Sequence, residues 1–112
     1  MNKYYARKTE VDGITFDSKH EAERYCELKL LWRAGEIREL MIQYPFELIP
    51  AQKDEKGKTI ERPVCYIADF VYFDKDGNLV VEDAKSQATK TDVYKLKRKL
   101  MLYFKGIAIK EV

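Results

Sequence analysis

The chain has 112 residues, of which 46% are hydrophobic and 36% are charged, and its formal net charge is +2. This length indicates one domain spanning residues 1–112 and excludes a second catalytic module, and no apolar run approaches the roughly 20 residues that cross a bilayer. Two widely spaced cysteines match no metal-binding motif, so we expect a cytoplasmic protein with free thiols and no membrane partner.

The first third of the chain predicts a strand followed by a helix. Residues 11–16 form a short strand, and Asp17 and Ser18 then supply helix-capping side chains. The helix runs to about residue 34 and ends at Gly35. Its apolar face repeats at three- and four-residue steps and consists of Ala22, Tyr25, Leu28, Leu31 and Trp32.

Three strands are expected in the middle of the chain. Residues 40–49 form the first, and Pro45 places it at a sheet edge or at a bulge. The polar residues 51–63 predict a flexible hairpin loop. Residues 64–73 and 79–85 form a second hairpin, because Asp76-Gly77 between two apolar strands is a strong turn signal.

A second helix begins at Thr91 or Asp92 and runs to about residue 104. Gly106 ends it, and residues 107–112 close the chain as a strand that pairs in parallel with residues 79–85. The resulting order, β-α-β-β-β-α-β, predicts an α/β (α+β) fold with a mixed sheet flanked by helices. The helix's expected core-facing residues are Val93, Leu96, Leu100, and Tyr103 or Phe104.

Two acids occupy the strands of the second predicted hairpin. By period-two alternation, Asp69 shares a face with Ile67 and Val71. A hairpin centred near residue 76 places residue 69 opposite residue 83 and residue 67 opposite residue 85. Two carboxylates would then lie side by side.

The second of these strands carries a lysine on the same face as its acid. Asp83 and Lys85 alternate onto one face with Val81, while Glu82 takes the other. A one-residue shift of register would instead make Glu82 the inward acid, but Lys85 would then lie on the opposite face, so we prefer Asp83.

Opposed like charges destabilise a sheet, so this arrangement predicts that Asp69 and Asp83 hold a divalent cation such as Mg²⁺. Lys85 would orient or deprotonate a water, or stabilise charge in the transition state. The alternative is a structural group in which the acids bond to Lys85 and to the backbone.

Asp69 followed by Asp83-Ala84-Lys85 on the next strand resembles the bipartite motif of the PD-(D/E)xK nuclease superfamily, with Ala68 where that motif often has proline. Residues 11–25, with Glu21 at the head of the helix, resemble a family of small phage-encoded proteins assigned to that superfamily. The resemblance implies a restriction-endonuclease-like fold and a DNA endonuclease dependent on Mg²⁺ or Mn²⁺. It also implies a role in phage DNA recombination, replication or packaging, of Holliday-junction-resolvase type, in the bacterial cytoplasm.

The resemblance further implies a set of site residues. The metal ligands would be Glu21, Asp69, Asp83 and the carbonyl of Ala84, and the catalytic residues would be Asp69, Asp83, Lys85 and Glu21. Glu21 has a second reading, because Ser18-Lys19-His20-Glu21 is also a capping box in which Glu21 bonds back to the backbone amide of Ser18.

A local excess of positive charge predicts contact with DNA. The expected phosphate-binding residues lie in and before the second helix: Lys90, Lys95, Lys97, Arg98 and Lys99. A second basic cluster lies at the N-terminus: Lys3, Arg7 and Lys8. The alternatives are a merely solvated helix face and, for the whole protein, a catalytically inactive nucleic-acid-binding module with a nuclease fold.

The limited size of the domain favours a homodimer, to which Tyr4, Tyr5 and Trp32 would contribute.

Overall fold

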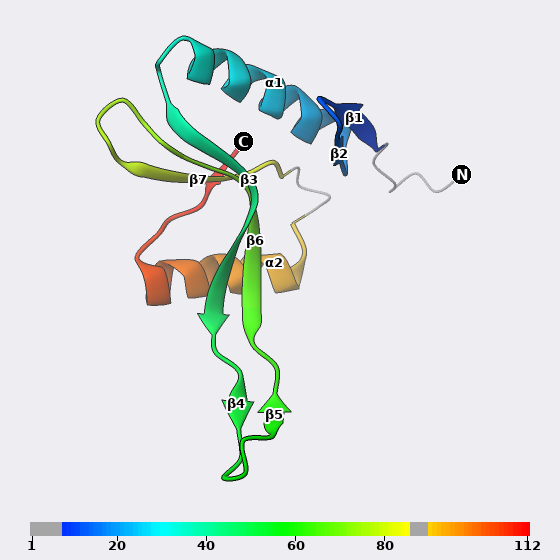
Figure 1. Cartoon of the computed structure of the whole chain (residues 1–112), viewed down its shortest axis with the longest axis vertical. Helices are drawn as coiled ribbons and strands as arrows, with labels where there is room; N and C mark the ends of the chain where they lie inside the picture. The colour runs from blue at the N-terminus through cyan, green and yellow to red at the C-terminus, as the bar shows by residue number, and fades with distance from the viewer. Residues whose placement is uncertain (1–7, 86–89) are drawn as a thin grey trace.

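A four-stranded sheet with a helix on each side forms the body of the protein (Figure 1). The computed structural model describes residues 8–85 and 90–112. In chain order the elements are β1 (Thr9–Val11), β2 (Ile14–Phe16), α1 (Lys19–Arg33), β3 (Arg38–Ile49), β4 (Gln52–Lys53), β5 (Thr59–Glu61), β6 (Val64–Phe73), β7 (Leu79–Asp83), α2 (Asp92–Leu100), the π-helical turn η2 (Met101–Lys105) and β8 (Lys110–Glu111).

The sheet has the strand order β3-β6-β7-β8. β3 and β7 each pair antiparallel with β6, and β8 pairs parallel with β7. The predicted mixed α+β architecture is therefore confirmed, as is the parallel pair that the helical crossover requires. None of the described helices is long and apolar enough to cross a membrane.

The two helices cover opposite faces of the sheet. Leu28 of α1 belongs to the same buried cluster as Phe70, whereas Met101 of η2 belongs to a second cluster with Val71. Phe70 and Val71 are neighbours on β6, and successive side chains of a strand point to opposite faces. The sheet therefore separates two small cores.

The β6–β7 hairpin has the predicted register. Phe70 pairs with Glu82 and Phe73 pairs with Leu79, and Gly77 at the turn has φ 84°. β3 is an edge strand with two register irregularities, as Pro45 indicated. Pro45 thus correctly predicted the edge position of β3, and the Asp76-Gly77 turn correctly predicted the register of the hairpin.

Residues 11–16, predicted as one strand, instead belong to a hairpin. β1 and β2 pair antiparallel around Asp12 and Gly13, whose φ values of 54° and 76° are both positive. Asp-Gly is the sequence that a two-residue hairpin turn favours, because both central residues must adopt φ > 0. The prediction missed this turn signal.

Residues 51–63 form an arm that projects from the body. β4 and β5 pair antiparallel beyond the ends of β3 and β6 (Figure 1). Asp54 shapes the tip, where its Oδ1 accepts hydrogen bonds from the backbone amides of Lys56 and Lys58 at 2.9 and 3.0 Å. The expected hairpin is present, with two short strands in it.

The apolar face predicted for the first helix is only partly buried. Ala22, Tyr25 and Leu28 are buried, but Leu31 and Trp32 in the last turn are exposed. The cluster beneath α1 ends at Leu28 and Ile37, so the last turn has no apolar surface of the sheet to cover.

The prediction for the second helix was only partly right about which side packs on the sheet. Leu100 packs against the core as predicted, but Tyr94 and Met101 are the buried residues, and the other predicted core residues are exposed: Val93, Leu96, Tyr103 and Phe104. Tyr94 can be buried because its hydroxyl donates to Glu111 Oε2 at 2.7 Å, which satisfies the polar end of the ring. Periodicity found the apolar stripe but not what it faces.

Candidate active site

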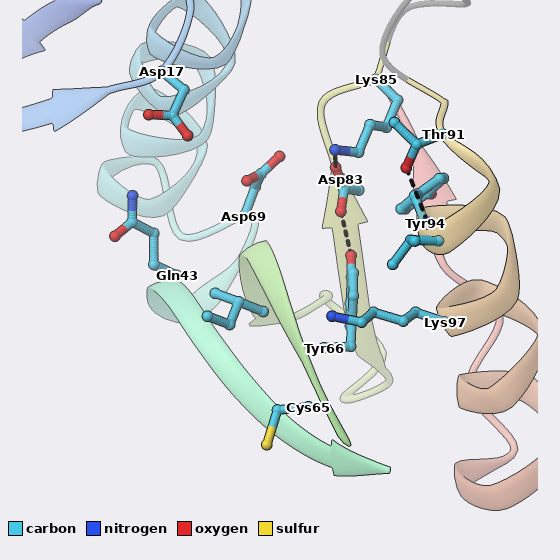
Figure 2. Close-up of a pocket in the computed structure, with 12 residues that line it drawn as sticks. Asp17, Gln43, Cys65, Tyr66, Asp69, Asp83, Lys85, Thr91, Tyr94 and Lys97 are labelled. Carbon is cyan, nitrogen blue, oxygen red and sulfur yellow. Dashed lines mark hydrogen bonds and ion pairs between the residues drawn. The ribbon is translucent and has the colours of Figure 1, made fainter. Parts of the chain in front are cut away.

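A cleft of about 580 Å³ opens between the central strands and the start of α2 (Figure 2). It contains three of the four predicted catalytic residues, Asp69, Asp83 and Lys85. The residues that line the cleft are Asp17, Gln43, Cys65, Tyr66, Ile67, Asp69, Asp83, Lys85, Thr91, Val93, Tyr94 and Lys97.

Asp83 is the last residue of β7, and its side chain is buried. The Tyr66 hydroxyl donates a hydrogen bond to Asp83 Oδ2 (Figure 2). The other oxygen, Oδ1, lies 3.3 Å from Lys85 Nζ, yet it is buried and has no hydrogen-bond partner among the described residues. A buried carboxylate oxygen in this state is costly unless a positive group satisfies it.

Asp69 lies on β6, across the hairpin from Asp83. Its Oδ2 accepts a hydrogen bond from the backbone amide of Ala84 at 2.8 Å, which fixes the carboxylate against the end of β7. Burial, and next the charge of Asp83, raise the pKa of Asp69 to about 8. The two acids therefore resist carrying full negative charge together.

The strand is irregular where it presents Asp69. Val71 packs with Ala68 rather than with Ile67, which is exposed, so the alternation of faces shifts by one position between Ala68 and Phe70. On β3, Gln43 lies between the partners of Ala68 and Phe70 and has φ 50°. The predicted shared face of Ile67, Asp69 and Val71 is thus wrong, because strict alternation does not hold at this irregularity.

Lys85 lies beside Asp83 at the cleft. Its Nζ is 3.3 Å from Asp83 Oδ1 and 4.8 Å from the centre of the Tyr94 ring, a cation–π contact. The ammonium group is held between a carboxylate and an aromatic face, and one quarter of the side chain remains exposed to solvent. It can therefore reach a ligand in the cleft.

Glu82 points to the opposite face, as alternation predicted. Arg24 of α1 donates from Nε to Glu82 Oε1 at 2.8 Å and from Nη2 to Oε2 at 2.7 Å, and the Tyr72 hydroxyl also donates to Glu82 Oε2. Glu82 is fully buried in this network. It attaches α1 to β7 and is not available to the cleft.

Glu21 lies in the first turn of α1 and is buried. Its backbone amide donates to Ser18 Oγ at 3.1 Å, which is one half of the predicted capping box. Burial raises the pKa of Glu21, and the charges of Asp17 and Asp83 raise it further. The carboxylate is therefore electrostatically coupled to the cleft acids, while its amide serves the helix cap.

The fit of these residues to a cation rests mainly on Asp83. Within residues 8–85 and 90–112, no three His, Cys, Asp or Glu side chains are arranged as a group that could hold a metal ion. The unbonded Oδ1 of Asp83, with Asp69 across the hairpin, is nevertheless the type of oxygen donor that Mg²⁺ prefers. The donor chemistry of Asp69 and Asp83 fits, whereas Glu21, the predicted third ligand, is not among the residues that line the cleft.

The predicted DNA-binding lysines do not form one surface. Only Lys97 lines the cleft; Lys95 and Lys99 are exposed elsewhere on α2. Lys90 and Arg98 are ion-paired with Glu111, at 3.1 and 2.9 Å. The expected basic residues Lys3 and Arg7 and the expected dimer contacts Tyr4 and Tyr5 lie outside the described residues.

Sequence reasoning missed several residues of the cleft. Tyr66 and Tyr94 pack beside the acids, and Asp17 and Gln43 line the opposite side (Figure 2). Tyr66 lies three residues before Asp69, so regular alternation would place it on the opposite face and the sequence offered no signal for it. Gln43 offered none, because its position depends on the irregularity of β3.

A model of the family described as "Protein of unknown function (DUF1064)" matches residues 1–110 of the chain. No curated protein and no solved structure matches the chain.

Proposed function

We propose that this chain, which belongs to the DUF1064 family, is a divalent-cation-dependent nuclease that hydrolyses phosphodiester bonds in DNA. The observation that carries the proposal is the pair of carboxylates at the cleft, Asp69 and Asp83, beside Lys85. One buried oxygen of the pair has an ion-pair partner but no hydrogen-bond partner within residues 8–85 and 90–112. The PD-(D/E)xK resemblance of the same three residues supports DNA as the substrate.

The electrostatics of the pair favour a cation. Burial, and next the charge of Asp83, raise the pKa of Asp69, so the two neighbouring carboxylates repel one another in a partly dry site. The bonds of Asp83 to Lys85 and of Asp69 to the Ala84 amide are those of the structural alternative, but they leave the repulsion between the two acids in place. A divalent cation would offset the repulsion and would satisfy Asp83 Oδ1.

The proposed ligands are Glu21, Asp69, Asp83 and the Ala84 carbonyl, with Mg²⁺ or Mn²⁺ as the ion. When bound, such an ion supplies Lewis acidity to the phosphodiester. The Tyr66 hydroxyl holds the Asp83 carboxylate in one orientation from behind.

Lys85 is the residue placed to act on the reacting groups. Its ammonium lies next to Asp83 Oδ1 and faces the cleft, so it can orient a water for attack or stabilise the negative charge that develops on the phosphate. Lys97, at the α2 side of the same cleft, would hold a neighbouring phosphate.

The test is cleavage of labelled linear duplex, single-stranded and four-way-junction DNA by the wild-type protein in Mg²⁺, in Mn²⁺ and in EDTA. We expect cutting with either ion and none in EDTA, and the preferred substrate will define the kind of nuclease. Salt-sensitive DNA binding without cutting under any ion would contradict the proposal and indicate the inactive binding module instead.

A further inference from the structure

The outward side of the second helix carries an apolar stripe. The residues of this stripe, here called the outer apolar face, lie along α2 and η2: Val93, Leu96, Tyr103 and Phe104. All four are more than half exposed, at 62%, 56%, 81% and 52% respectively, whereas Leu100 between them is half-buried and packs against the inner core.

The helix has no further need of this face for its own packing. Tyr94 and Met101, seven residues apart, bury the inward side against the sheet. Surface helices ordinarily turn their single apolar stripe to the core, so a second stripe in solvent is costly. The rings of Tyr103 and Phe104 contact each other edge to face, with their centroids 5.0 Å apart, so the exposed end of the stripe is one aromatic surface.

We propose that the outer apolar face binds the same face of a second copy of this chain, with the two helices antiparallel about a two-fold axis. Asp92 lies at the start of the stripe and Lys105 at its end. An antiparallel pair brings the acidic start of one helix beside the basic end of the other and opposes the two helix dipoles. Lys97, four residues after Val93, borders the stripe on the side of the cleft.

The available area matches what such a dimer needs. Taking roughly 200 Å² for a fully exposed aromatic side chain and roughly 100 Å² for Val or Leu, and scaling each by its exposed fraction, the four residues present about 400 Å² per copy. Two copies then bury about 800 Å² of apolar side-chain surface. A standard interface buries about 1,600 Å² in total, a little over half of it apolar.

The face is continuous with the cleft. Val93 lies on the outer apolar face and also lines the cleft, next to Lys97. A two-fold pair through this face therefore places two clefts close to the dimer axis. If the proposed nuclease function holds, the dimer presents two cutting sites to one substrate; the dimer itself does not rest on that function.

The first test is the molar mass of the protein by light scattering or sedimentation equilibrium from 1 to 200 µM, without DNA or metal. We expect twice the chain mass of 13.2 kDa for wild type and for Leu30→Glu, and the chain mass for Leu96→Glu. Leu30 is the matched control, since it is 65% exposed but lies on α1. Wild type at the chain mass throughout, or a dimeric Leu96→Glu, would overturn the proposal.

A gain-of-crosslink test covers the case in which Leu96→Glu fails to fold. In a Cys26→Ser background, which removes the exposed native thiol, a short bismaleimide should crosslink Leu96→Cys into a dimer. Pairing residue 92 with residue 105 sets position 96 opposite position 101 of the other copy, too far from the second position 96 for a direct disulfide. Leu30→Cys in the same background should not be crosslinked. Equal crosslinking of the two, or none at position 96, contradicts the proposed face. A monomer that still cuts DNA would remove this inference alone, and a dimer that does not cut would remove only the nuclease.

Discussion

Asp83 and its neighbours show how one side chain can be held for binding. Tyr66 bonds one oxygen from within the core, and the second oxygen is left without a hydrogen-bond partner in the part of the chain that the structure describes. Orientation by a group behind the ligand is the usual way to pre-set a carboxylate for a cation, and losing such a partner typically costs about 10–100-fold in affinity or activity.

The raised pKa of Asp69 predicts how stability depends on pH in the metal-free protein. The folded-state pKa of about 8 lies above the ordinary value of 3.8, so the folded protein retains a proton that the unfolded chain has already lost. The free energy of unfolding should therefore fall as pH rises from about 4 to about 8. Urea unfolding in EDTA at several pH values measures this.

Asp69→Asn is the control for that prediction, because it removes the titrating group and keeps its shape. The variant should show a flatter pH dependence than wild type over the same window. Superimposable pH profiles of wild type and variant would show that Asp69 does not titrate in this range.

At the residue scale, it was easier to predict which residues enter the cleft than to predict which face every neighbouring side chain takes. The choice of Asp83 over Glu82 for the cleft followed from alternation on a regular strand, β7. The faces of Ile67 and Val71 could not be predicted from alternation, because β6 and β3 are irregular at Asp69 and Gln43. A positive φ in a glutamine has no signature in a single sequence.

At the element scale, the buried pair of Arg24 and Glu82 joins α1 to β7, and so joins the helix of Glu21 to the strand of Asp83. Removing Arg24 leaves the fully buried Glu82 with the Tyr72 hydroxyl and the more distant ammonium of Lys110, at 3.9 Å, as its remaining partners. We expect Arg24→Gln to lower the free energy of unfolding by about 3–5 kcal/mol, measured by urea denaturation.

Two further variants define the Arg24 effect. Adding Glu82→Gln to Arg24→Gln should recover part of the loss, because no buried charge then remains unpaired. Lys75→Gln breaks an exposed pair with Glu36 and should change stability by no more than about 0.5 kcal/mol. Equal effects of Arg24→Gln and Lys75→Gln would show that the buried pair is not important.

The position of the lysines on α2 predicts unequal contributions to DNA binding. Lys97→Gln should weaken binding and reduce the slope of log K against log salt by about one, because Lys97 lines the cleft. Lys95→Gln removes the same charge from an exposed site off the cleft and should change the slope less. Fluorescence anisotropy across a salt series measures both, and the reverse ranking would place DNA elsewhere.

Element types and their order were largely predictable, since caps, turns and periodicity are local signals. Ser18, the Asp76-Gly77 turn and the crossover to β8 all followed from such signals. The orientation of α2 could not be predicted from such signals, because an apolar stripe has the same sequence pattern whether it faces the sheet or a partner. The buried side is decided by Tyr94 and by its hydroxyl partner Glu111, seventeen residues away.

At the scale of the whole molecule, the sheet brings together segments that are far apart in the chain. The cleft receives Asp17 from before α1, Asp69 from β6, Asp83 from β7 and Lys97 from α2. The hairpin register alone predicted that Asp69 and Asp83 meet. The contributions of Asp17 and Gln43 depend on how α1 and β3 pack, which is a property of the assembled fold.

The assignment of this cleft as the active site is tested most directly by single-turnover DNA cleavage with saturating Mg²⁺ or Mn²⁺. The rates to compare are those of Asp83→Asn and Asp76→Asn. Both changes remove one carboxylate from the β6–β7 hairpin, but Asp76 lies in its exposed turn. We predict that Asp83→Asn abolishes cleavage while its circular dichroism stays that of wild type, and that Asp76→Asn cuts at the wild-type rate. Cleavage by a folded Asp83→Asn at an undiminished rate would contradict the assignment of this cleft as the active site.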